Sequence, residues 1–287
     1  YSWTVAAIGI TGASASMGTS IAQTLVNSCS LIRTAIYTIT PDLGSFIGSS
    51  INVPITVVPL PSVSVIPLTQ TICSGDQNAI AITSGVPGAS FSWTVTQTDV
   101  TGAIDGTGNT ITQTLTSSSQ ITGTAVYSIA ASSTGCTGAS VISTVNVNPL
   151  PDVIATPTAD TICSGETTAI ALSSGVVNTN YSWTVSAPGI TGALNGSGSN
   201  ISQALSNGGV SPVNAVYTIT PTSQGCQGAA QTVSVNVSPV INANAGVDQS
   251  IIYGTTTTLD ATASVGVNLE YSWQTVDSLA SGLGTST

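Results

Sequence analysis

The stretch that decides the fold is YSWTV at residues 181–185. Its first, third and fifth side chains are apolar, whereas Ser182 and Thr184 between them carry hydroxyl groups. Because successive side chains of an extended strand point to opposite faces, this alternation is typical of a strand with one buried face. The pentapeptide therefore predicts a β-strand whose tryptophan faces a core.

The pentapeptide belongs to a repeat of 90 residues. Its tryptophan recurs at that spacing, and so does a tyrosine in the phrases AIYTI, AVYSI and AVYTI. A fixed spacing of this kind indicates one supersecondary unit copied in series. We expect these aromatic residues to lie in the core of each unit: Trp3, Trp93, Trp183, Trp273, Tyr37, Tyr127 and Tyr217.

Proline-containing segments predict the boundaries between units, because proline stops a strand and stiffens the chain that follows. The segments VPLP, NPLP and SPVI divide the chain into four parts. We expect the C-terminal part of a first repeat at 1–60, complete repeats at 61–150 and 151–240, and the N-terminal part of a fourth, cysteine-free repeat at 241–287.

Short alternating runs fill each unit and are separated by Gly, Asn, Ser and Pro, with no sustained period of 3.6 residues. Six to eight short strands in about 90 residues, with one tryptophan on an inner strand, are typical of an immunoglobulin-like β-sandwich. A continuous β-helix is the alternative, but its rungs need a much shorter repeat. We therefore predict an all-β chain of tandem sandwiches arranged end to end.

The composition excludes several classes of function. The chain has eleven acidic residues against one basic residue, Arg33, with no Lys or His, and its net charge is −10. Nucleic acids and anionic membrane surfaces are bound through clustered basic residues, so neither partner is expected. Catalytic triads, imidazole metal sites and Schiff-base lysines are excluded as well. No apolar run reaches the roughly 18 residues of a membrane span, so membrane insertion is not expected.

The five cysteines indicate an oxidising compartment. Recurrence at the 90-residue spacing favours bonds within repeats, Cys73 with Cys136 and Cys163 with Cys226, each worth about 4 kcal/mol. A bond between Cys136 and Cys163 across a boundary is the alternative. Cys29 has no counterpart, so its partner stays open between an upstream cysteine, another chain and none. The absence of a CxxC motif argues against a metal site.

No pattern of residues predicts a catalytic or cofactor site. The acidic residues are scattered and almost none recurs in register, so the facing carboxylates of glycoside hydrolysis are not expected. Calcium held by loop oxygens stays an alternative, although the chain has no DxDxDG sequence. The tryptophans are in phase with apolar neighbours, which favours a core over a sugar-stacking surface. We expect no catalysis, no cofactor and no metal.

The phrases TICSG, FSWTV, VTGAIDGTGNTITQTL, AVYSI, STGCTGA and VNVNPLP resemble the PKD-like, immunoglobulin-like repeats of large secreted surface proteins of Bacteroidota. That group includes gliding-motility adhesins and other substrates of type IX secretion. The resemblance covers residues 1 to about 240, and the remainder is similar to a cysteine-free variety of such repeats. The WDFGDG-like signature of typical PKD domains is missing. Two short sequences, DTI and DSL, resemble the O-glycosylation sequon of that phylum and mark Thr161 and Ser278.

The resemblance implies an extracellular or cell-surface protein whose repeats serve as a stalk, a spacer or the shaft of an adhesive filament. The expected partners are neighbouring repeats and copies of the chain itself. A mean hydropathy of +0.41 and few charges favour such self-association. Two alternatives stay open: a module that binds a glycan or protein, and accessory repeats of a secreted hydrolase.

Overall fold

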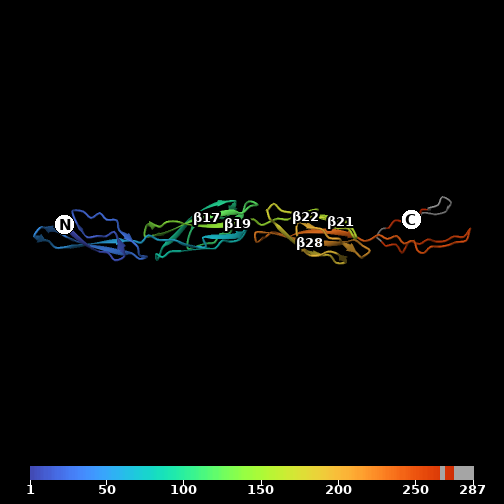
Figure 1. Cartoon of the computed structure of the whole chain (residues 1–287), viewed down its shortest axis with the longest axis horizontal. Coiled ribbons are helices and arrows are strands. Elements are labelled where there is room, and N and C mark those ends of the chain that lie inside the picture. The colour runs from blue at the N-terminus through green and yellow to red at the C-terminus, as the bar shows by residue number, and fades with distance from the viewer. Residues whose placement is uncertain (266–268, 275–287) are drawn as a thin grey trace. The chain divides into compact units, whose positions relative to one another are not determined.

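The computed structural model describes residues 1–265 and 269–274 of the chain (Figure 1). Every regular element in this described part is a β-strand, which confirms the all-β prediction. The chain divides into two compact units, the first from Tyr1 to Pro149 and the second beginning at Leu150. Repeats 1, 2 and 3 denote residues 1–60, 61–150 and 151–240.

Repeat 3 folds as a β-sandwich with one large and one small sheet. The large sheet has the order β21-β30-β28-β23-β25, with β29 paired to β28, and the small sheet has the order β20-β22-β26. Strand β21 runs parallel to β30, whereas the other pairs are antiparallel. Figure 1 labels β21, β22 and β28. The strands are β20 (Ile154–Thr156), β21 (Ala159–Cys163), β22 (Ile170–Ser173), β23 (Asn180–Ser186), β24 (Ile190–Thr191), β25 (Gly196–Ser197), β26 (Asn200–Ile201), β27 (Ser206–Asn207), β28 (Val213–Ser223), β29 (Cys226–Gln227) and β30 (Gln231–Ser238).

Repeat 2 has the same arrangement. Its large sheet has the order β10-β19-β17-β12-β14, with β18 paired to β17, and its small sheet has the order β15-β11-β9. Strand β10 again runs parallel to its neighbour, β19. The strands are β9 (Ser64–Ile66), β10 (Thr69–Cys73), β11 (Ile80–Thr83), β12 (Ser90–Thr98), β13 (Val100–Thr101), β14 (Gly106–Thr107), β15 (Thr110–Ile111), β16 (Thr116–Ser117), β17 (Gly123–Ser133), β18 (Cys136–Thr137) and β19 (Val141–Asn148).

Repeat 1 keeps the large sheet, in the order β3-β1-β5-β8, with two short ribbons that pair β2 with β4 and β6 with β7. Within the described residues it has no small sheet and no strand beside the outer edge of β8. One side of its large sheet therefore lacks the cover that repeats 2 and 3 possess. The strands are β1 (Ser2–Ala6), β2 (Ile10–Thr11), β3 (Ser16–Met17), β4 (Val26–Asn27), β5 (Arg33–Thr40), β6 (Asp42–Leu43), β7 (Phe46–Ile47) and β8 (Ile51–Val57).

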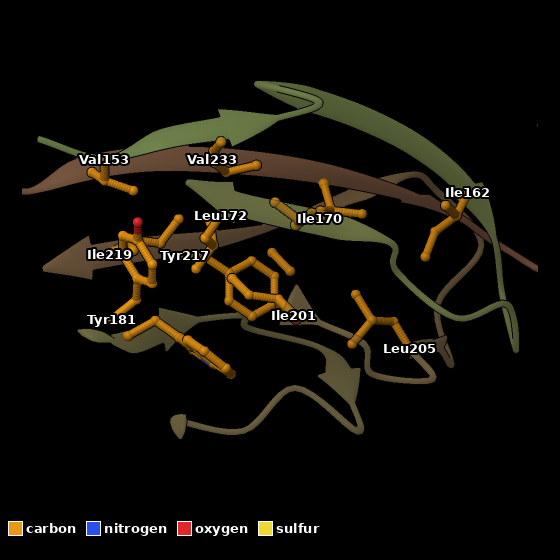
Figure 2. Packing of buried hydrophobic residues seen from close by; sticks show 14 of the residues in the cluster. Val153, Ile162, Ile170, Leu172, Tyr181, Ile201, Leu205, Tyr217, Ile219 and Val233 are labelled. Carbon is orange, nitrogen blue, oxygen red and sulfur yellow. The ribbon is translucent and has the colours of Figure 1, made fainter. Parts of the chain in front are cut away.

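The core of repeat 3 lies between its two sheets. Tyr217 stands opposite Val185 on β23 and Val233 on β30, so the three side chains point the same way from adjacent strands. Leu172 of β22 faces them from the small sheet and belongs to the same buried cluster. Figure 2 shows side chains of this cluster between the strands of the sandwich. Repeat 2 has an equivalent cluster around Tyr127.

The aromatic residues at the 90-residue spacing occupy equivalent places in the three sheets. Six of the seven expected core residues are buried, as the alternation in YSWTV predicts: Trp3, Trp93, Trp183, Tyr37, Tyr127 and Tyr217. Trp273 differs, because it is only half-buried and lies outside any strand. Within the described residues of 241–287 the backbone pairing is limited to the isolated bridge of Asn242 with Val265, so no sheet covers the Trp273 ring.

The predicted disulfides within repeats are not formed, and the sheet register explains why. Cys73 ends β10 beside Asn148, and that end of the sheet also holds Gly123, the first residue of β17. Cys136 pairs with Ser133, the last residue of β17. The two cysteines therefore stand at opposite ends of an eleven-residue strand, on the order of 30 Å apart. A disulfide needs α-carbons within about 7 Å of each other.

The same geometry separates Cys163 from Cys226 in repeat 3, because Cys163 lies at the Ser238 end of β30 and Cys226 at the far end of β28. Cys73 and Cys226 are disulfide-bonded, whereas Cys29, Cys136 and Cys163 carry free thiols. Both sequence-based pairings are thus wrong, since the alternative bond between Cys136 and Cys163 is also not formed.

Candidate functional site

The most distinctive polar arrangement in repeat 3 is a chain of hydrogen bonds in the core, which we call the Trp-Gln-Tyr network. The indole Nε1 of Trp183 donates to the carbonyl oxygen of Leu194 at 3.2 Å. Gln203 donates from Nε2 to the same oxygen at 2.7 Å, and its Oε1 accepts from the Leu194 N–H at 3.0 Å. Tyr217 donates its hydroxyl to Gln203 Oε1 at 2.8 Å. The loop at Leu194 is thereby fixed to the large sheet.

Local sequence explains how the indole reaches this loop. Gly196 of β25 lies opposite Trp183 on β23, and an ideal Cβ at Gly196 would lie 2.7 Å from Cζ2 of the indole. The ring therefore packs against bare backbone. Gln203 follows β26 and lies beside the isolated bridge of Thr167 with Ala204, which fixes this segment to the residues before β22. The network thus joins the loop at Leu194 to two strands of the large sheet through Gln203.

Repeat 2 contains the same network. Trp93 Nε1 and Gln113 Nε2 donate to the carbonyl oxygen of Ile104 at 3.1 and 2.8 Å. Tyr127 donates its hydroxyl to Gln113 Oε1 at 2.8 Å.

Repeat 1 contains it as well, although its small sheet is missing from the described residues. Trp3 Nε1 and Gln23 Nε2 donate to the carbonyl oxygen of Ser14 at 3.1 and 2.8 Å. Tyr37 donates to Gln23 Oε1 at 2.6 Å. The network is therefore built by the large sheet and its adjoining loop alone.

The glutamine is the site residue that sequence reasoning missed. A signal was present, because IAQTL, ITQTL and ISQAL place Gln23, Gln113 and Gln203 at the same 90-residue spacing as the tryptophans. A glutamine between apolar residues has the donor and acceptor capacity to bridge a buried tyrosine and a backbone loop.

The small sheet adds one further polar side chain to the network. In repeat 2, Asn78 accepts from the backbone N–H of Gln113 at 2.6 Å and donates to the Tyr127 hydroxyl at 3.1 Å. In repeat 3, Thr168 accepts from the N–H of Gln203 at 3.0 Å. Both side chains are buried. In repeat 1, no described residue accepts from the N–H of Gln23.

Burial sets the protonation of the two covered tyrosines. It raises the pKa of Tyr127 and Tyr217 above the ordinary value of a phenol, and the hydrogen bond from Asn78 partly offsets this for Tyr127. Both hydroxyls therefore stay protonated at neutral pH and act as hydrogen-bond donors. This chemistry holds the fold together and provides no nucleophile or base.

The uncovered side of repeat 1 forms an apolar groove of about 260 Å³. Its lining residues come from β5, β8 and the segment before β4: Ile21, Gln23, Leu25, Tyr37, Ile39, Val53 and Ile55. Ile55 is 40% exposed, whereas Val145 and Val235, at the same position of repeats 2 and 3, are 0% exposed. We call this surface the open face. Ile55 therefore occupies a position that is buried in the core of repeats 2 and 3 but is exposed to solvent in the described part of repeat 1.

The remaining predicted sites receive little structural support. Thr161 is exposed on β21, and its N–H bonds the carboxylate of Asp160 at 2.8 Å, so its glycosylation stays a prediction. Ser278 lies outside the described residues. The half-buried thiol of Cys29 lies 3.8 Å from the carbonyl oxygen of Gly9. Across residues 1–265 and 269–274, no three His, Cys, Asp or Glu side chains gather as metal ligands, and no helix is long and apolar enough to span a membrane.

Comparison with known proteins places the repeats in a family. The PKD-like domain family matches residues 1–61, 70–151 and 160–241, which together are most of the chain. No match was found among curated proteins.

Solved structures with weak similarity are extracellular or modular β proteins. Human mucin-like protocadherin EC1-2 is 10% identical over 62% of this chain and 99% of that chain, with a TM-score of 0.33. Protocadherin gamma B2 extracellular cadherin domains 3–6 are 14% identical over 83% and 68%, also at 0.33. Fibronectin(III)-like modules of CbhA from Clostridium thermocellum are 13% identical over 61% and 94%, at 0.27. Scores this low support no inference about function.

Proposed function

Because the chain belongs to the PKD-like domain family, a family of non-catalytic repeats, we propose that it is a structural region of an extracellular surface protein. In this proposal the tandem repeats serve as the stalk of an adhesin or the shaft of an adhesive filament. PKD-like repeats together with disulfide-bonded cysteines suggest an extracellular protein, where disulfides persist.

One observation carries the proposal: the features that recur every 90 residues are interior features. The Trp-Gln-Tyr network has the same connections in three repeats, and the buried positions around Tyr127 and Tyr217 match one another. The acidic residues, by contrast, show almost no such recurrence. A stalk requires every repeat to be stable and requires no repeat to carry a distinct surface.

The strand order also suits a segment that bears tension. In repeat 3, β21 near the start of the repeat lies parallel to β30 at its end, from Ala159 beside Ser234 to Cys163 beside Ser238. Tension applied through the two ends of the repeat would pull these strands in opposite directions along their length. Their hydrogen bonds would then be loaded together in shear instead of being broken one at a time. Repeat 2 has the same parallel pair in β10 and β19.

Single-molecule force spectroscopy tests this proposal. When the chain is pulled through its ends after reduction of the disulfide-bonded cysteines, Cys73 and Cys226, repeats 2 and 3 should unfold in separate events, each releasing on the order of 25 nm of chain. Pulling repeat 3 through handles at residues 163 and 238, which are adjacent in register, should peel the same strands apart at a much lower force. Equal forces in the two geometries would contradict a load-bearing role.

The adhesive role and the surface location must be tested on the native protein in its cellular setting. We expect antibodies against repeats 2 and 3 to label intact cells or extracellular filaments. We also expect electron microscopy of the purified native protein to show thin rods or ordered fibres. Labelling that appears only after the cells are permeabilised would contradict the proposal.

A further inference from the structure

The outer edge of the large sheet is open in repeat 2 but capped in repeat 3. Strand β10 forms this edge in repeat 2 and β21 forms it in repeat 3. Among the described residues, each strand is paired on one side only, β10 with β19 and β21 with β30. A strand at a sheet edge presents a row of N–H and carbonyl groups to which another strand can bond. The two edges therefore differ in what a partner strand would meet.

The hydrogen bonds between β10 and β19 fix which backbone groups point outward. The carbonyl oxygen of Leu68 accepts from an N–H of β19 at 2.9 Å, and the N–H of Ser74 donates to a carbonyl oxygen of β19 at 2.8 Å. Successive residues of a strand direct these groups to opposite edges, so the even-numbered residues of this segment bond β19. Thr69, Thr71 and Cys73 therefore direct their N–H and carbonyl groups away from the sheet.

Two of these three residues keep their outward groups unbonded. At Cys73 the edge is capped, because its N–H donates to the carboxylate of Asp76 at 3.2 Å and its carbonyl oxygen accepts from the N–H of Asp76 at 3.0 Å. Across residues 1–265 and 269–274, no group bonds the N–H or carbonyl oxygen of Thr69 or Thr71 from the outer side. Both threonines are exposed, so the edge offers solvent a row of donors and acceptors.

The same edge of repeat 3 is capped by one carboxylate. Thr161, the counterpart of Thr71, donates its N–H to Oδ1 of Asp160 at 2.8 Å. Repeat 2 has Gln70 in place of Asp160, and the Gln70 side chain accepts instead from the N–H of Ala79 at 3.2 Å. The Gln70 side chain thus lies along its own repeat. This difference leaves Thr71 uncapped and closes the edge at Thr161.

The open edge is complementary to itself. In antiparallel pairing across a two-fold axis at Gln70, Thr69 of one copy stands opposite Thr71 of the other. Because both residues direct their backbone groups outward, each such pair exchanges both of its N–H···O bonds. The two Gln70 side chains then face each other and are neutral. Asp160 at the same place of repeat 3 would set two carboxylates opposite each other, which opposes pairing.

We propose that β10 of repeat 2 pairs antiparallel with β10 of a second copy of the chain, with Gln70 on the two-fold axis. The second copy is favoured over a foreign strand because the register is self-complementary and because β10 carries no charge in a chain of net charge −10. A closed two-fold contact is also the commonest association of identical chains. A five-residue edge buries less surface than a standard interface, so the dimer should be weak and reversible.

The inference does not depend on the stalk function. It concerns only the pairing of β10, whereas the stalk proposal concerns the mechanical stability of each repeat. A chain that stays monomeric would leave the result of the pulling experiment unaffected, so the two proposals fail separately.

Analytical ultracentrifugation of the whole chain tests the proposal. Cys29, Cys136 and Cys163 are replaced by serine, because their free thiols can link two chains covalently. We expect a reversible equilibrium between monomer and dimer, with a dimer fraction that rises as the concentration reaches the high micromolar range.

Hydrogen exchange at single amides locates the contact. The amides of Thr69 and Thr71 should exchange more slowly as the concentration rises, because each then bonds a carbonyl oxygen of the second copy. The amide of Thr161 should show no such dependence, because Asp160 already accepts from it.

Matched proline variants test the outward N–H. Thr71→Pro removes an N–H that no bond within the repeat uses, and an edge strand tolerates proline where this group faces solvent. Thr71→Pro should weaken dimerisation by at least about tenfold, whereas Thr161→Pro, the same change in repeat 3, should leave it within about twofold. Gln70→Asp supplies the carboxylate of repeat 3 and should weaken dimerisation as Thr71→Pro does. Circular dichroism serves to confirm that each variant keeps the fold.

Three outcomes would overturn the proposal. The first is a monomer at every concentration, which would leave the edge to a strand of a different protein. The second is a dimer that neither Thr71→Pro nor Gln70→Asp weakens. The third is an equal loss of dimerisation in Thr71→Pro and Thr161→Pro.

Discussion

Repeats 1 and 3 share a register and a hydrogen-bonded network but differ in how they are covered. Both fix a tryptophan-bearing strand to a loop through a glutamine and a tyrosine, with closely similar distances. In repeat 3 the small sheet buries Ile201, Leu205 and Val235 completely, whereas the counterparts in repeat 1 stay partly exposed. The comparison separates two tasks: the large sheet organises the polar network, and the small sheet completes the burial of the apolar positions that face it.

The largest effect should come from removing a core side chain in the covered repeat. Leu205→Ala should lower the free energy of opening of repeat 3 by about 3 to 5 kcal/mol, because a fully buried leucine leaves a cavity. Leu25→Ala, at the same position of repeat 1, should cost less than half as much because this side chain is already partly in contact with water. Hydrogen exchange on peptides from each repeat measures both values. Equal losses of stability from Leu205→Ala and Leu25→Ala would contradict the difference in burial between repeats 3 and 1.

A glycine near the β28–β29 turn tests the contact between the start and the end of a repeat. A Cβ on Gly228 would overlap the carbonyl oxygen of Pro151, so Gly228→Ala should cost repeat 3 about 2 to 3 kcal/mol. A Cβ on the counterpart in repeat 1, Gly48, would meet the side chain of Pro41 at 2.7 Å and no backbone atom of the described residues within 4 Å. Gly48→Ala should therefore cost clearly less in the same exchange experiment. A larger loss of stability from Gly48→Ala than from Gly228→Ala would show that the contact of Gly228 with the Pro151 carbonyl does not limit the size of the side chain at this position.

The network glutamine should have an intermediate effect. Gln203→Met keeps the length of the side chain but leaves the Tyr217 hydroxyl and the Leu194 N–H without their partner, at a cost of about 1 to 2 kcal/mol. Gln23→Met should cost less because water can reach the groove of repeat 1. Thermal unfolding followed by circular dichroism, together with exchange of each repeat, gives the comparison. Unchanged stability in both variants would mean that the network orients these side chains without contributing to the free energy of unfolding.

The smallest effect should be a dependence on alkaline pH that comes from the covered tyrosines. The pKa of Tyr127 and Tyr217 is raised in the folded chain by burial, so the fold favours the neutral phenol. Unfolded tyrosine ionises near about pH 10, so the stabilisation is fully present below that pH and is lost as pH rises through the raised folded pKa. Thermal midpoints between about pH 8 and 11 should fall at the alkaline end. Tyr217→Phe should reduce the slope, and an unchanged slope would exclude this tyrosine as a source.

Several features of the fold could be predicted from the sequence because they depend on local alternation. The strand around Trp183 and the buried face of Tyr217 both follow from a period of two in apolar residues. The spacing of 90 residues between tryptophans then extends each local prediction to the other repeats. Trp273 shows the limit of this reasoning. A side chain that alternates with polar neighbours is buried only where adjacent strands also cover it.

The cysteine pairing could not be predicted because recurrence along the chain does not report distance in space. Cys73 and Cys136 recur together, yet the register of β17 places them at opposite ends of the large sheet. The parallel position of β10 beside β19 decides this, and no feature of the sequence TQTIC distinguishes a parallel from an antiparallel edge. The network was missed for a different reason, since Gln203 stands among other polar residues, such as Ser202 and Ser206, and its sequence context does not show that it reaches the Tyr217 hydroxyl.

Hydrogen exchange along the last strand of each repeat tests the central claim most directly. Among the described residues, strand β8 of repeat 1 has a neighbour on one side only and carries Pro54, whereas β30 of repeat 3 lies between β28 and β21. We expect amides of β30 to exchange slowly along its length, while alternate amides of β8 exchange rapidly. Equal, slow exchange in the two strands would show that the face and edge of repeat 1 are covered in solution, and would contradict the account.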